Sequence, residues 1–149
     1  MAQDRSILSG CLVINNKGEI LLLYKNTHQH YETPGGKLEV AECVDPKNPT
    51  LEELAKTAER EAYEELGSDI ELEPLSYFCK IDFTIPDGGQ ATAHKFVTSI
   101  KTGTPRINEP DIFTRLDYLP LKRLETYPIS PDLKLILPKI KSLKKEEFP

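Results

Sequence analysis

The sequence has few cysteines and none of the spacings that cysteine chemistry usually requires. Its three cysteines, Cys11, Cys43 and Cys79, lie far apart and include no Cys-x-x-Cys pair. A disulfide framework or a thiolate zinc cluster is therefore not expected. Because free thiols are typical of reducing compartments, we predict a cytoplasmic location.

Long apolar runs and a surplus of basic charge are also missing. No run approaches the ~20 apolar residues that a membrane-spanning helix needs, and the polar residues 1–5 have no signal-peptide character, so we expect neither membrane insertion nor secretion. The formal net charge of −5 argues against binding a nucleic acid polymer, which requires a basic surface. A small nucleotide is still compatible with this charge, since a metal ion held by carboxylates reverses the local field.

Two common catalytic motifs are absent as well. The sequence contains neither the Gly-x4-Gly-Lys-Ser/Thr phosphate-binding loop nor a Gly-x-Ser-x-Gly turn that would present a nucleophilic serine. With 149 residues, 38% of them hydrophobic, the chain has the size and composition of one folded domain. We therefore predict a single domain, residues 1–149.

Strand-like segments surround one long predicted helix. This helix begins after Thr50, in a Thr-x-x-Glu capping box, and ends at Gly67. Pro131 suits the first turn of a second helix, which Pro138 is expected to kink or end. We predict strands at 7–15, 20–25, 70–73, 75–85, 93–101 and 112–118, a short helical turn at 119–124, and loops or turns at 15–18, 33–36, 43–50, 86–89 and 103–112. This order of elements favours an α+β or mixed-sheet domain.

The most informative residues are three glutamates near the end of the long helix. Glu61 precedes Glu64 by three residues and Glu65 by four, which places all three on one flank of the helix, beside its apolar stripe. Like charges at this spacing cost stability unless a cation holds them, and Mg²⁺ prefers carboxylate and phosphate oxygens. Charge-rich helices are also common as solvated surfaces, so the helix alone leaves both interpretations open.

The spacing of these glutamates within a longer motif resembles the Nudix signature, G-x5-E-x7-R-E-U-x-E-E-x-G-U, where U is a bulky apolar residue. The matching residues are Gly36-x5-Glu42 and Arg60-Glu61-Ala62-x-Glu64-Glu65-x-Gly67. The chain departs from the signature at two places. Seventeen residues instead of seven separate Glu42 from Arg60, which is an insertion of ten, and Ser68 occupies the last U position.

The resemblance extends over most of the chain and points to MutT-like members of the family. Residues 31–36 are similar to an aromatic-x-x-Pro-Gly-Gly segment that precedes the signature, and Gly103 to Glu109 is similar to a later Gly-x-Pro loop. The fold that the resemblance implies is the Nudix α/β/α sandwich, in which a mixed β-sheet lies between helices.

The resemblance also implies roles for individual residues. Mg²⁺, for which Mn²⁺ can substitute, would be bound by Gly36, Glu61, Glu64, Glu65 and Glu109. Glu61, Glu64 and Arg60 would be the catalytic residues, with Glu61 as general base or ligand of a second ion and Arg60 orienting the carboxylates. Substrate would contact Lys25, Tyr31 and Asp132, and Gly35, Glu42 and Gly67 would support the motif. Glu109 can equally be an exposed loop acid, and Asp132 an acid favoured by the dipole at a helix start.

The activity implied is hydrolysis of a nucleoside diphosphate linked to another group, and a nucleoside triphosphate giving a monophosphate and pyrophosphate is the favoured substrate. Metal ions lower the pKa of a bound water, and a carboxylate removes its proton. Two alternatives remain open: an ADP-ribose or nucleotide-sugar pyrophosphatase, and a Nudix-fold sensor that binds a nucleotide without cutting it. Such sensors usually lose the glutamates that this chain keeps. We expect a monomer or a homodimer.

Overall fold

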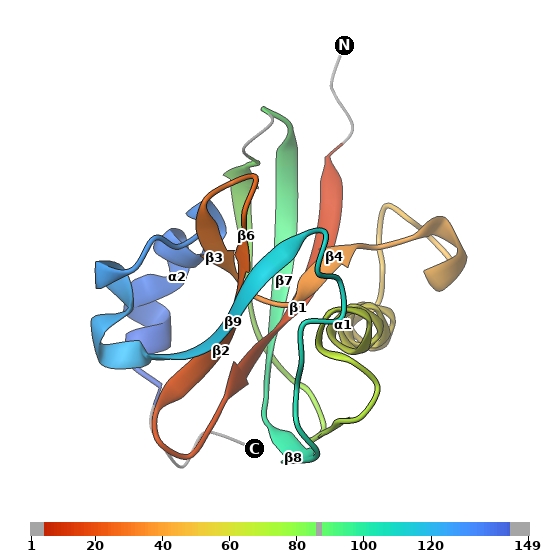
Figure 1. The fold of residues 1–149 in the computed structure, drawn as a ribbon. Coiled ribbons are helices and arrows are strands. Elements are labelled where there is room, and N and C mark those ends of the chain that lie inside the picture. The colour runs from red at the N-terminus through yellow and green to blue at the C-terminus, as the bar shows by residue number, and fades with distance from the viewer. Residues whose placement is uncertain (1–4, 86–87, 144–149) are drawn as a thin grey trace.

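A mixed β-sheet lies between two helices in the computed structural model, which describes residues 5–85 and 88–143 (Figure 1). The seven strands of this sheet are β1 (Ser6–Ile14), β2 (Glu19–Lys25), β3 (His30–Glu32), β4 (Gly35–Lys37), β6 (Ser76–Thr84), β7 (Gln90–Thr98) and β9 (Phe113–Pro120). The helices are α1 (Leu51–Leu66) and α2 (Pro131–Lys141), and the short 3₁₀ helices are η1 (Val40–Glu42) and η2 (Leu121–Thr126). This architecture confirms the predicted α/β/α sandwich.

The sheet is mixed because its central strand has a parallel and an antiparallel neighbour. Its main path runs β3-β2-β1-β7-β6, with β4 also paired to β1 and β9 to β2. Strands β1 and β7 are parallel, whereas β1 and β2 form an antiparallel hairpin. A second, two-stranded sheet pairs β5 (Glu71–Leu72) with β8 (Ile100–Thr102). The long connection between β1 and β7 contains α1, which covers one face of the sheet (Figure 1).

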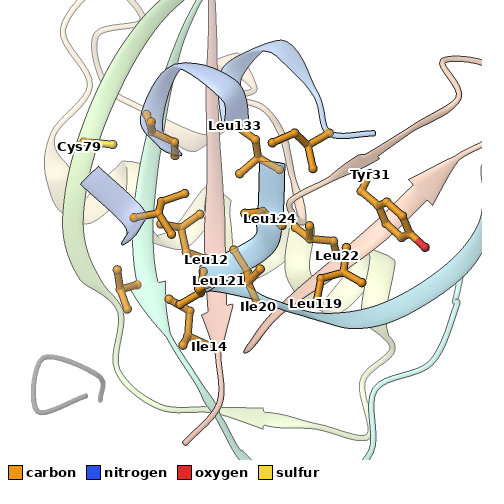
Figure 2. Close-up of a cluster of buried hydrophobic side chains, with 14 residues drawn as sticks. Leu12, Ile14, Ile20, Leu22, Tyr31, Cys79, Leu119, Leu121, Leu124 and Leu133 are labelled. Carbon is orange, nitrogen blue, oxygen red and sulfur yellow. The ribbon is translucent and has the colours of Figure 1, made fainter. Parts of the chain in front are cut away.

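Alternation along the central strand builds one hydrophobic core on each face. Leu12 and Ile14 point to the face covered by α2 and η2, where they pack with Leu133 (Figure 2). Cys11 and Val13 point to the opposite face, where they pack against α1. Because successive side chains of a strand face opposite sides, the apolar run of β1 supplies both cores.

Local signals set both ends of α1. The Thr50 hydroxyl accepts a hydrogen bond from the Glu53 N–H at 3.1 Å, and the Glu53 carboxylate accepts from the Thr50 N–H at 2.9 Å. These two bonds form the predicted capping box. At the other end, Gly67 has a φ of +92°, which a glycine adopts without strain. The ten-residue insertion therefore lies in the loop before the helix and leaves α1 intact.

One sequence prediction needs correction, and for Pro138 one of its two expected effects is excluded. Gly35 and Gly36 were expected in a loop, but they form β4, whose pairing with Ser9 and Gly10 of β1 is a long-range contact that a local turn signal does not reveal. Pro138 does not end α2, which continues to Lys141. Pro138 lies on the exposed face of α2, so the backbone carbonyl that loses its N–H partner there can be solvated.

The remaining predicted segments agree with the structure within a few residues, except that 93–101 divides between β7 and β8. Pro86 and Asp87 of the predicted turn lie outside the described residues. Within residues 5–85 and 88–143, no helix has the length and apolar character needed to cross a membrane.

The positions of two leucines relative to the cores predict that their replacement by alanine lowers the free energy of unfolding by different amounts. Leu22 is fully buried, whereas Leu135 is 57% exposed. Leu22→Ala should lower the free energy of unfolding by about 2–5 kcal/mol because it leaves a cavity. Leu135→Ala should change it by less than about 0.5 kcal/mol. Urea denaturation of both variants measures the difference, and equal costs would contradict the assignment of Leu22 to the core.

Candidate active site

A buried carboxylate lies where α1 meets β4. Glu65 is only 3% exposed, and its Oε2 accepts a hydrogen bond from the Gly35 N–H at 2.9 Å. Burial raises the pKa of this carboxyl well above its usual range, and the hydrogen bond from Gly35 offsets that effect only in part. An ionised Glu65 therefore needs a further positive charge nearby.

Glu61 lies against the backbone of β4, in the space that a side chain on Gly36 would occupy. A Cβ atom on Gly36 would be 2.4 Å from Glu61 Oε1, well inside van der Waals contact. Burial raises the pKa of the Glu61 carboxyl, as do the charges of Glu64 and Glu109, while Arg60 opposes them. Gly36 thus lets a carboxylate approach a backbone segment closely, in surroundings that disfavour its negative charge.

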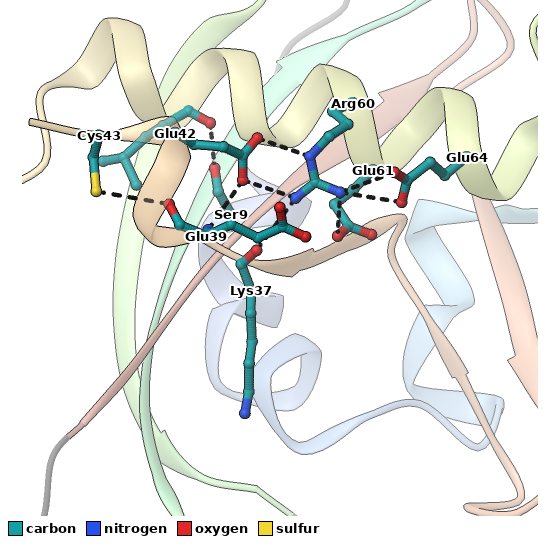
Figure 3. Close-up of polar contacts among 9 residues, drawn as sticks. Ser9, Lys37, Glu39, Glu42, Cys43, Arg60, Glu61 and Glu64 are labelled. Carbon is teal, nitrogen blue, oxygen red and sulfur yellow. Dashed lines mark hydrogen bonds and ion pairs between the residues drawn. The ribbon is translucent and has the colours of Figure 1, made fainter. Parts of the chain in front are cut away.

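Arg60 joins three of the predicted motif glutamates (Figure 3). Its Nε and Nη2 donate to the two oxygens of Glu42 at 2.7 and 2.9 Å, and its Nη1 donates to Glu61 and Glu64, each at 3.0 Å. The bidentate pair holds the pKa of the Glu42 carboxyl below its usual range. Although the insertion separates Glu42 from Arg60 in sequence, the two side chains are in direct contact.

The loop that carries Glu109 is anchored to the last turn of α1. The N–H groups of Arg106 and Asn108 donate to the carbonyls of Leu66 and Glu65 at 2.9 and 3.1 Å, and Asn108 Nδ2 donates to the Glu64 carbonyl at 2.8 Å. These bonds satisfy carbonyls that a helix end leaves unpaired. They bring Glu109 near enough for its charge to raise the pKa values of both Glu61 and Glu65.

This set of donors fits a hard divalent cation. Glu61 lies beside the Gly36 backbone and Glu65 beside the Gly35 N–H, and the buried Glu65 has only part of its charge compensated. Mg²⁺ prefers oxygen ligands of this kind. The Glu64 side chain is half-exposed and held by Arg60, so a rotation of its side chain would be needed to bring it to the ion. The observed geometry is therefore compatible with the ligand set implied by the sequence.

A pocket of about 240 Å³ adjoins the carboxylate cluster. It is lined by Gly35 and Gly36 at one end and by Asp132 at the start of α2, with Lys25 also in its wall. Phe83 and Ile85 add an apolar surface. The pocket thus combines groups that can contact an anion, a polar ligand and a flat apolar ring.

Asp132 forms a buried ion pair with Lys95 in the wall of this pocket. The two side chains are 2.7 Å apart, and Lys95 Nζ also donates to the Thr33 hydroxyl at 2.7 Å. Burial alone would raise the pKa of the Asp132 carboxyl, but the charge and hydrogen bond of Lys95 outweigh it and hold the pKa below its usual range. Asp132 is therefore an acceptor of hydrogen bonds at neutral pH.

Tyr31, which the sequence analysis predicted as a substrate contact, and Lys95, which it overlooked, both show how the alternation of side chains along a strand decides which of them reach the pocket. Tyr31, expected to contact substrate, points into the core beside α2, and its hydroxyl donates to Asp117 at 2.6 Å. The geometry gives no support for a substrate contact by Tyr31; its strand neighbours His30 and Glu32 line the pocket instead. Sequence reasoning missed Lys95, although a lysine in phase with the apolar residues Ala93 and Val97 of a strand is a signal that could have found it.

The buried position of Glu65 predicts a stability change that depends on pH. Without metal, Glu65→Gln should raise the free energy of unfolding at neutral pH by about 1–3 kcal/mol, because a buried charge is removed. Because burial raises the pKa of this carboxyl in the folded state, ionisation favours the unfolded chain, and the carboxyl costs stability progressively as the pH rises above its ordinary pKa. The gain should vanish as the pH falls towards the ordinary value of 4.5.

Denaturation in a chelator, across pH, measures this effect. Glu59→Gln, which removes an exposed carboxylate from the same helix, is the matched control and should have little effect. Added Mg²⁺ should stabilise the unsubstituted protein more than Glu65→Gln, because it binds only the folded chain. A Glu65→Gln variant that is less stable than the unsubstituted protein at neutral pH would contradict this account.

Comparison with known proteins identifies the family. The model of the NUDIX domain matches residues 5–140, while no curated protein matches the chain in sequence. A MutT NUDIX hydrolase from Burkholderia pseudomallei has a similar structure, with a TM-score of 0.73 and 24% identity over 91% of this chain and 98% of that chain.

Two further structures show the same fold. The MutT protein from Methanosarcina mazei Go1 gives a TM-score of 0.71 at 16% identity, over 94% of this chain and 95% of that chain. The NUDIX domain of Shewanella oneidensis NrtR, solved in complex with ADP ribose, gives 0.65 at 12% identity, over 93% and 87%. Since the family model spans nearly the whole sequence, the chain belongs to the NUDIX-domain family, and its fold is that of the MutT structures to which it is similar.

Proposed function

We propose that this NUDIX-domain protein is a MutT-like hydrolase that uses Mg²⁺ to convert a nucleoside triphosphate to a nucleoside monophosphate and pyrophosphate. The observation that carries the proposal is the position of the buried Glu65 at the Gly35 N–H and of Glu61 at the Gly36 backbone, where these two glycines line a pocket. Glu61, Glu64, Glu65, Glu109 and the Gly36 carbonyl would hold the ion. When bound, Mg²⁺ supplies charge neutralisation for the phosphates and lowers the pKa of water.

The protein's own groups would orient the reactants and move the proton. Arg60 fixes the positions of Glu61 and Glu64 through hydrogen bonds of 3.0 Å. Glu61 is the proposed general base, and its raised pKa makes it a stronger base than an ordinary exposed carboxylate. Lys25, at the pocket wall, would contact a phosphate oxygen of the substrate.

The other end of the pocket would bind the nucleoside. Asp132 is ionised and buried beside Lys95, so it would accept a hydrogen bond from an N–H group of the base, while the Phe83 side chain supplies apolar surface. A volume of about 240 Å³ is small for a ligand pocket. This size favours a single nucleoside over a ligand with two nucleoside-like ends.

Hydrolysis of ADP-ribose or a nucleotide sugar is the second candidate. Its support is the likeness in fold to the Shewanella oneidensis domain solved with ADP ribose. A panel of nucleoside triphosphates, ADP-ribose and nucleotide sugars, each with Mg²⁺, separates the candidates by their products. Release of pyrophosphate from a triphosphate supports our proposal, preferential cleavage of ADP-ribose supports the alternative, and binding without turnover would indicate a sensor.

Removal of one metal-binding carboxylate should abolish most of the activity. Glu64→Gln should lower kcat by about 10³-fold, because the ion contributes several kcal/mol to the reaction. The fold should persist, since the Glu64 side chain is 50% exposed. Steady-state kinetics with Mg²⁺ measures this loss, and Glu59→Gln serves as the control on the same helix. Unchanged turnover in Glu64→Gln would reject the metal assignment.

Three broader expectations accompany this proposal. The cysteines Cys11, Cys43 and Cys79 are all free, which supports a reducing, cytoplasmic location. We also propose that residues 1–149 form a single Nudix domain, active as a monomer or a homodimer on small nucleotides.

A further inference from the structure

Three potential metal ligands outside the Nudix motif lie together on the wall of the pocket. They are His28, His30 and Glu32, and one donor atom from each lies within 4.8 Å of the others. His28 Nδ1 is 3.4 Å and His30 Nε2 2.7 Å from the same carboxylate oxygen, Glu32 Oε2. Two imidazoles therefore converge on one carboxylate.

The backbone arranges these side chains before any ion binds. His30 and Glu32 are two residues apart on β3, so they face the same side of the strand. His28 joins them from the preceding turn, where Gln29 has a φ of 54° and its N–H donates to the Lys25 carbonyl at 2.8 Å.

The opposite side of β3 anchors the cluster. Tyr31 is 4% exposed in the core, and its N–H donates to the Pro128 carbonyl at 2.7 Å. Because Tyr31 lies between His30 and Glu32 in the strand, its burial fixes the direction in which both of them point.

We propose that His28, His30 and Glu32 form a second metal site, specific for a first-row transition-metal ion such as Zn²⁺. Imidazole nitrogen is a good ligand for Zn²⁺, whereas Mg²⁺ prefers oxygen. With bond lengths near 2.0–2.2 Å, the ligands of a tetrahedral ion lie roughly 3.4 Å apart. His28 Nδ1 is already at about this distance from Glu32 Oε2, whereas His30 Nε2, at 2.7 Å from the same oxygen, must move away slightly to admit the ion.

The proposed site lies in the wall of the pocket that Gly35 and Gly36 also line, and it shares no ligand with the Nudix carboxylates. All three side chains line this pocket, and the Glu32 charge is near enough to raise the pKa of Glu65. A zinc ion with three protein ligands keeps a fourth position open. That position is available to an anionic group, such as a phosphate, bound in the pocket.

The chain contains three histidines in all, which gives the experiment an internal reference. His94 lies on β7, where its Nδ1 is 3.0 Å from the Tyr77 hydroxyl. The protein, carrying Cys43→Ser to remove a partly accessible thiol, is labelled with ¹⁵N-histidine and titrated with Zn²⁺ in excess Mg²⁺. We expect the ring signals of His28 and His30 to shift, while those of His94 stay unchanged.

Variants distinguish this site from the carboxylates of α1. His30→Ala and Glu32→Gln should each weaken Zn²⁺ binding by at least about tenfold in calorimetry, since each removes one of three ligands. His94→Gln should bind as the parent does, and circular dichroism verifies that all variants are folded. Equal Zn²⁺ affinity in His30→Ala and the parent, or displacement of Zn²⁺ by Mg²⁺, would overturn the proposal. Neither result depends on which substrate the enzyme hydrolyses.

Discussion

The need to compensate negative charge at the end of α1 governs the rest of the structure. Glu61, Glu64 and Glu65 lie within five residues, and Glu109 approaches them from another loop. Burial makes the charge of Glu65 costly. Arg60 compensates part of this excess through Glu61 and Glu64, and we propose that a divalent cation compensates the remainder.

The positions of Glu61 and Glu65 lower the stability of the folded protein. Glu65 is buried on the same helix as the apolar Ala58, Ala62 and Leu66, where a neutral side chain would be more favourable. Gly36 must lack a side chain so that Glu61 can approach. Such conflicts between local stability and placement are characteristic of functional sites.

Charge compensation also shapes the far end of the pocket. There the negative charge of Asp132 is neutralised by the positive charge of Lys95, 2.7 Å away. The proposed active site thus has a metal-dependent end near α1 and a charge-neutral end near α2. This division matches a substrate whose phosphates are highly charged and whose base is not.

Local sequence signals predicted the features that depend on nearby residues. The capping box at Thr50, the stop at Gly67 and the spacing of Glu61 to Glu65 all involve residues within one or two helical turns. They sufficed to place α1 and to propose a metal site on it. The motif also predicted that Glu42 supports this group of residues, and the structure places its carboxylate in contact with Arg60 despite the insertion between them.

Features that depend on long-range pairing were not predicted. The strand character of Gly35 arises from its pairing with β1, and the facing of Tyr31 into the core depends on the register of β3. A shift of one residue exchanges the two faces of a strand, so the motif located this segment but not the direction in which Tyr31 points. Lys95 and Asp132 are far apart in sequence and meet only through packing.

The most direct test of the central claim is a crystal structure with Mn²⁺ in place of Mg²⁺ and a slowly hydrolysed nucleoside triphosphate analogue. Anomalous scattering would then locate the ion independently of the side chains. Our account predicts an ion bound by Glu64 and Glu65 near the Gly36 carbonyl and in contact with the phosphates of the analogue. Phosphates bound elsewhere, with these carboxylates facing solvent and no ion between them, would contradict it.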